Sequence, residues 1–87
     1  MPDKPREATA DEVRWVLGAL PEAMDPEVVS VHALTREDGA AWFWVYPRDV
    51  EIGDVYVTWV VERTVAGAAS VGSFRSRRSE RGDVTVP

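Results

Sequence analysis

The segment "TREDGAAWFWVYP" (residues 35–47) decides the fold, because it places a turn signal directly before a strand that is apolar on both faces. Asp38 and Gly39 form the strongest short hairpin signal in the chain. Residues 28–35 are rich in β-branched side chains and predict the outgoing strand, and residues 41–46 predict the return strand. Pro47 ends the return strand, since proline has no N–H to donate to a sheet.

The length of the hairpin loop decides which residues form the core, because a shift of one residue moves every side chain to the opposite face. A loop of two or four residues predicts a core face that carries Val29, Val31, Ala33, Trp42, Trp44 and Tyr46. The outer face then carries Ser30, His32, Leu34, Ala41, Phe43 and Val45. A three-residue loop would exchange the two halves of this division, and the sequence leaves that alternative open.

One amphipathic helix is predicted before the hairpin. Thr9 and Glu12 have the spacing of a capping box, which marks a helix start. Behind them one apolar stripe recurs at helical spacing, formed by Val13, Val16, Leu17 and Leu20. Pro21 disfavours helical geometry at Leu20 and so predicts the end of the helix. Trp15 lies roughly 150° from the centre of the stripe on a helical wheel, so it is expected to point away from the core, against the N-terminal arm or toward a partner.

The rest of the chain predicts further strands and polar connections. Residues 55–65 and 71–75 have strand character, and residues 84–86 are a candidate short edge strand. Residues 1–8 are expected to form a loose arm, and residues 76–83 a basic polar loop. The predicted fold is α+β, a single domain over residues 1–87, with one N-terminal helix on an antiparallel meander of about four strands.

Composition limits the class of protein. The chain has 87 residues, 45% hydrophobic and 29% charged, as expected of a folded domain. The absence of cysteine excludes a disulfide framework and thiolate chemistry. No apolar run is long enough for a signal peptide core or a membrane span, so a cytoplasmic protein without a membrane partner is expected. Nine of the ten basic residues are arginine, which is typical of a GC-rich actinobacterial or phage genome.

Catalysis is not expected. His32 is the only histidine, and Ser30, two residues away on the same strand face, points parallel to it rather than toward it. No spacing matches a metal site, a calcium loop or a phosphate-binding loop. The sequence therefore predicts no catalytic, metal or cofactor-binding residues.

Leftover apolar surface favours a protein-interaction module, meaning a small accessory, adaptor or inhibitor protein. Its partner is another protein or a second copy of the chain, and its predicted contact residues are Trp15, His32, Phe43 and Val45. On this hypothesis Phe43→Glu abolishes association and leaves the monomer folded.

Charge supplies two alternatives. Residues 1–62 hold five basic and thirteen acidic groups, whereas residues 63–87 hold five basic and two acidic groups. Nucleic-acid binding would use the basic end, through Arg75, Arg77, Arg78 and Arg81. An acidic inhibitor of a basic partner protein would use the rest of the chain.

Overall fold

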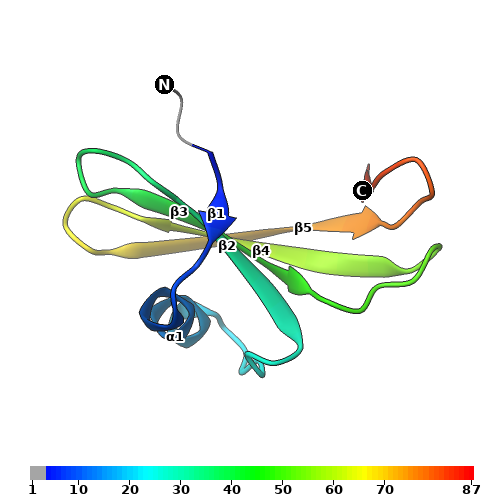
Figure 1. Cartoon of the computed structure of the whole chain (residues 1–87), viewed down its shortest axis with the longest axis horizontal. Coiled ribbons are helices and arrows are strands. Elements are labelled where there is room, and N and C mark those ends of the chain that lie inside the picture. The colour runs from blue at the N-terminus through cyan, green and yellow to red at the C-terminus, as the bar shows by residue number, and fades with distance from the viewer. Residues whose placement is uncertain (1–3) are drawn as a thin grey trace.

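The computed structural model describes residues 4–87 and contains one helix and one antiparallel sheet, an α+β arrangement. The sheet has six strands in the order β1-β2-β3-β4-β5-β6, so every strand pairs with its neighbours in sequence (Figure 1). The strands are Arg6–Glu7 (β1), Val29–Thr35 (β2), Ala41–Pro47 (β3), Val55–Arg63 (β4), Ala69–Arg77 (β5) and Val84–Val86 (β6). The sheet therefore has more strands than the four or so predicted. The added strands are the two at its edges: β1 was not predicted, and β6 matches the candidate edge strand at residues 84–86.

Two boundaries differ from those predicted from the sequence, one at each end of the sheet. Arg6 and Glu7 pair with Ala33 and His32, so the predicted loose arm is in part a strand. Residues 1–3 of that arm lie outside the described residues. At the other end β5 continues to Arg77, so the polar loop starts two residues later than predicted, at Arg78.

The β2–β3 hairpin has a three-residue loop. Arg36 donates its N–H to the Ala40 carbonyl at 2.8 Å, and Gly39 donates to the Arg36 carbonyl at 3.1 Å. Gly39 has φ of +90°, a conformation that glycine adopts readily and that turns the chain back into the strand. The β4–β5 hairpin repeats this pattern, with Gly67 at φ +90° and Thr64 bonded to Ala68 at 2.9 Å.

This loop length overturns the predicted core face. Val31 lies opposite Val45, Ala33 opposite Phe43 and Thr35 opposite Ala41. The small aliphatic residues of β2 therefore share a face with Ala41, Phe43 and Val45, and all of these β3 residues are fully buried. Trp42, Trp44 and Tyr46 lie on the other face, where they pair with Leu34, His32 and Ser30, respectively.

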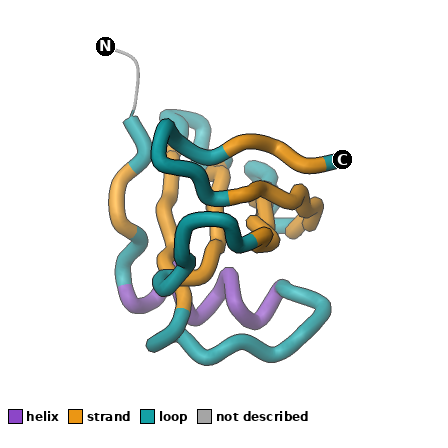
Figure 2. The backbone as a smooth tube through the Cα atoms, turned by 90° about the vertical axis from the view of Figure 1, so that its right-hand side faces the viewer, coloured by secondary structure: helices purple, strands orange, loops and turns teal. Residues whose placement is uncertain are grey.

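Helix α1 (Ala10–Ala19) covers the face that carries Phe43 and Val45. Its capping box is formed as predicted, with the Thr9 hydroxyl and the Glu12 carboxylate each accepting the other residue's backbone N–H. Val16 is fully buried against the sheet, and Leu20 follows it at the helix end. The core comprises Val16, Leu20, Val29, Val31, Ala33, Ala41, Phe43, Val45 and Val61. Figure 2 shows the helix along one side of the strands.

Candidate protein-binding surface

The face of the sheet opposite α1 carries apolar side chains that the fold leaves unexplained. Within residues 4–87 no helix lies on it, because the only helix packs on the other side. Antiparallel sheets with one solvated face usually alternate apolar and polar residues, with the polar residues outward. Here the outward positions include Leu34, Trp42, Trp44, Tyr46, Val60 and Phe74. We call this surface the open face.

Cross-strand pairing arranges the open face in rows. One row runs Leu34, Trp42, Glu62 and Ser70 across β2 to β5, and the next runs His32, Trp44, Val60 and Gly72. Phe74 lies opposite Thr58, beyond the end of the β3–β4 pairing, and is 41% exposed. The two indoles are half-buried. Large aromatic side chains at the centre of a surface are typical of protein contact sites.

A hollow of about 160 Å³ lies on the open face beside the Trp42 ring. Val60, Glu62, Ser70 and Gly72 complete its lining. It exists because Gly72 has no side chain: a Cβ added there would meet no other heavy atom within 4 Å. The Arg36 guanidinium lies 5.4 Å from the centroid of the Trp42 ring, so the indole already attracts one cation of the chain itself.

Two predicted contact residues are in the core. Phe43 and Val45 have no exposed surface, because the three-residue loop turns both toward α1. The prediction that they lie on the outer face is wrong, and neither can contact a partner while the protein is folded. Trp42 and Trp44, predicted as core, occupy the open face instead.

Trp15 is also placed differently from its predicted position. Its ring lies 5.6 Å from the Phe43 ring, tilted by 48°, and the Arg63 guanidinium lies 5.3 Å from the indole and 5.4 Å from Phe43. The centre of the apolar stripe does not face the sheet directly. Val16 faces the core, and Val13 and Leu17 are only half-buried on one flank of the helix. Trp15 thereby comes to the opposite flank and closes the core under Arg63.

His32 lies on the open face as predicted, and its ring is paired with Tyr46. The two rings are stacked, with centroids 5.6 Å apart, and His32 Nδ1 is 3.0 Å from the Tyr46 hydroxyl. Within the described residues no hydrogen bond joins His32 to Ser30, and no group of three potential metal ligands occurs. The ring is therefore held in place by a structural contact.

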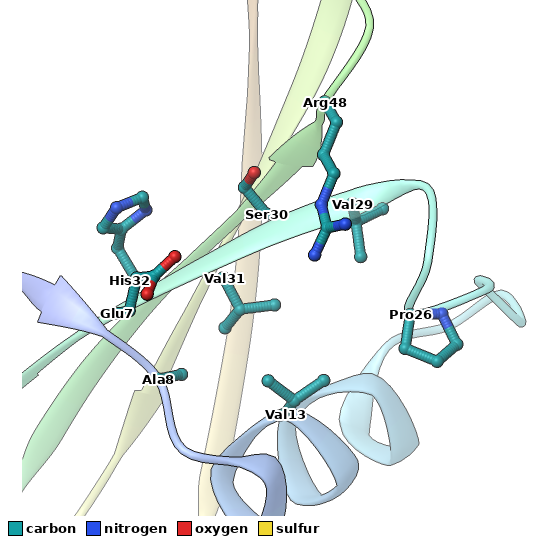
Figure 3. Close-up of a pocket in the computed structure, with 9 residues that line it drawn as sticks. All are labelled: Glu7, Ala8, Val13, Pro26, Val29, Ser30, Val31, His32 and Arg48. Atoms are coloured by element: carbon teal, nitrogen blue, oxygen red, sulfur yellow. The ribbon is translucent and has the colours of Figure 1, made fainter.

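A second hollow, of about 210 Å³, lies beside β2 where β1 ends (Figure 3). Figure 3 shows Glu7 and His32 on one side of it, Val13 below, and Arg48 reaching in from the end of β3. The remaining lining is mostly aliphatic. Nothing in this arrangement pairs a nucleophile with a base.

The four predicted phosphate-binding arginines do not form one surface. Arg75 and Arg77 point to the helix side of the sheet, whereas Phe74 points to the open face. The Arg75 side chain donates to the carbonyl of Pro87, and the Arg77 side chain donates to the carbonyl of Gly53. Arg78 forms an ion pair of 2.8 Å with Asp83 and lies 5.5 Å from the Tyr56 ring. Burial and, after it, the Asp83 carboxylate raise the pKa of Tyr56. Arg81 is exposed in the loop.

Valine residues beyond the reach of α1 form a further apolar surface. The helix covers β2, β3 and part of β4. Within residues 4–87 the helix side of the rest of β4, and of β5 and β6, is left uncovered. Val55, Val57, Val71 and Val84 are 38–60% exposed there, with Arg75 and Arg77 between them. The sequence predicted leftover apolar surface without this location, because the extent of helix coverage depends on packing.

No protein-family model matches the chain, and no curated protein or solved structure is similar enough to count as a relative. No helix among the described residues is long and apolar enough to cross a membrane.

Proposed function

We propose that the protein is a non-catalytic protein-interaction module that binds its partner on the open face. The observation that supports this function is the outward position of Trp42, Trp44 and Phe74 on a sheet face without a covering helix. A contiguous apolar patch on a small domain usually marks an interface. Trp and Tyr are also the residues that contribute most to binding at such sites.

The partner segment that fits the open face carries a lysine or arginine next to an apolar residue. In the hollow beside Trp42, a cation would meet the face of the indole and the Glu62 carboxylate. The aliphatic part of the same side chain would lie on Val60, over the space that Gly72 leaves. The net charge of −5 also favours association with a basic partner. In this form the proposal includes inhibition of a basic protein.

Selection from random peptides displayed on phage tests this proposal. Peptides selected on the wild type should contain a basic residue beside an apolar one. Gly72→Leu fills the hollow and Glu62→Gln removes its charge, so both should lose binding. Ser73→Leu is the matched control, since it adds the same side chain one residue away on the other face. Selected peptides that bind all four proteins equally, or that contain no basic residue, would overturn the proposal.

Nucleic-acid binding remains the alternative, and the placement of the arginines weakens it. Arg75 and Arg77 point away from the face on which Phe74 could stack on a base. Titration with single- and double-stranded oligonucleotides at low and high salt separates the two functions. Salt-sensitive binding that falls when Arg75 and Arg81 are replaced would favour nucleic acid over a protein partner.

A further inference from the structure

Strand β5 has an uncovered edge along most of its length. All nine of its residues pair with β4, but only Arg75, Ser76 and Arg77 pair with β6. Within residues 4–87 no strand lies beside the other six, Ala69 to Phe74, and all six are exposed. The remaining backbone hydrogen-bonding groups of this edge are therefore open to solvent or to another chain.

The hydrogen bonds of the two ends of the β4–β5 ladder show which groups point outward. Thr64 bonds to Ala68 at one end, and Arg78 bonds to Asp54 at the other, each at 2.9 Å. Since bonded pairs alternate in an antiparallel ladder, the even-numbered residues of β5 bond to β4. The N–H and C=O groups of Ala69, Val71 and Ser73 consequently point away from β4, toward the free edge.

This edge lacks the features that normally prevent strand pairing. Edge strands are usually protected by charged residues, proline, a bulge or short length. The β1 edge has them: it is two residues long, both are charged, and Pro5 precedes them. In contrast, residues 64–74 contain no charged residue and no proline.

We propose that two copies of the protein associate by antiparallel pairing of their β5 edges, with Val71 at the two-fold axis. In this register Ala69 lies opposite Ser73 of the second copy, and Val71 lies opposite Val71 of the second copy. The spacing of the three outward residues is symmetric about Val71, so every outward N–H meets an outward carbonyl. The pairing ends at Ser73, two residues before Arg75, which pairs with Val86 at the end of β6.

A second copy fits this edge better than an unrelated strand because the edge is complementary to itself and carries no charge that would repel its own copy. The contact is small, so we expect a reversible equilibrium between monomer and dimer. The inference does not depend on the proposed function, since the edge and the open face are different surfaces. Val71 points to the helix side, as its pairing with the buried Val61 shows.

Substitution of Val71 by residues of opposite charge tests both the dimer and its symmetry, because in the proposed dimer Val71 lies opposite Val71 of the second copy. The wild type should sediment as a monomer–dimer equilibrium between about 10 µM and 1 mM, a range that covers weak association. Val71→Lys and Val71→Glu should each be monomeric alone, and their equimolar mixture should form a heterodimer. Val71→Thr is the matched control and should dimerise like the wild type, since it keeps the shape and the edge hydrogen bonds.

Three results would overturn the inference: a wild type that stays monomeric throughout this range, charged variants that dimerise as the wild type does, or a mixture that stays monomeric although the wild type dimerises. Circular dichroism of each variant checks that it is folded. Peptide binding to the open face should persist in monomeric Val71→Lys, so that a failure of the dimer and a failure of the proposed function give different results.

Discussion

Phe43 shows how far the role of one residue depends on which face of the strand it occupies. It is the largest fully buried side chain, and Trp15, on α1, and Arg63 both lie against it. Phe43→Ala should cost about 3–5 kcal/mol of unfolding free energy, a large share of the total for a small domain. Urea unfolding followed by circular dichroism measures this loss.

The matched control is Phe74→Ala on the open face, where the expected cost is about 1 kcal/mol or less. Equal costs for the two variants would contradict the burial of Phe43. Phe43→Glu should unfold the protein for the same reason, because it places a charge without a partner in the core. The hypothesis that this variant leaves a folded monomer is therefore withdrawn.

Gly72 destabilises the strand in which it lies and leaves the hollow beside Trp42. Its backbone is not in the left-handed region and a Cβ meets no neighbour, so Gly72→Thr should raise the unfolding free energy by about 0.5–1 kcal/mol. Thermal unfolding measures the change. Gly39→Thr is the control of opposite sign, because Gly39 has φ of +90°. A destabilised Gly72→Thr would show that the strand requires glycine for another reason.

At the scale of elements, a pH-dependent contact connects β1 to α1. Arg6 donates from both terminal nitrogens to the two oxygens of Glu12, at 2.8 and 3.0 Å. This hydrogen bonding, chiefly, lowers the pKa of Glu12 from its ordinary value of 4.5 to about 2. A lowered pKa in the folded state means that the stabilisation is complete above pH 4.5 and is lost as the pH falls toward 2.

Unfolding curves measured across this acid range give the free energy of unfolding at each pH. As the pH falls, this free energy should decrease less steeply for Glu12→Gln than for the wild type. The two proteins should approach equal stability near pH 2, apart from the change in the helix cap. Asp11→Asn is the control, because Asp11 is exposed and its contact with Arg14 is 3.4 Å long. Identical slopes for Glu12→Gln and the wild type would show that the contact with Arg6 does not stabilise the fold.

Sequence reasoning succeeded for elements with local signals and failed where one loop sets a long-range register. The capping box at Thr9 and Glu12 is a local pattern, and the helix starts where it predicts. The Asp38-Gly39 pair correctly located a hairpin, but loops of two and three residues both accommodate it. This difference of one loop residue places Phe43 in the core and Trp42 and Trp44 on the surface. The open-face residues therefore could not be assigned before the pairing was known.

At the scale of the whole molecule, the core occupies one half of the sheet. The fully buried strand residues come from β2, β3 and β4, whereas the apolar residues Val71 and Phe74 of β5 are exposed. The helix position that produces this asymmetry has no signature in the sequence, since the apolar pattern of residues 55–61 is the same beneath the helix and beyond it. Stability should therefore differ between the two halves of one sheet.

Native-state hydrogen exchange on the dilute monomer should reveal this difference. Amides of β3 that bond to β2 or β4 should exchange only through global unfolding, because opening them exposes the core around Phe43. The outward amides of Val71 and Ser73 should exchange nearly without protection, and the inward amides of Gly72 and Phe74 should have an intermediate free energy of opening. Raising the protein concentration should slow Val71 and Ser73 selectively if β5 edges pair. A single free energy of exchange for all strands would instead show that the sheet opens only as one unit, with the valine surface of β4–β6 as firmly held as the core.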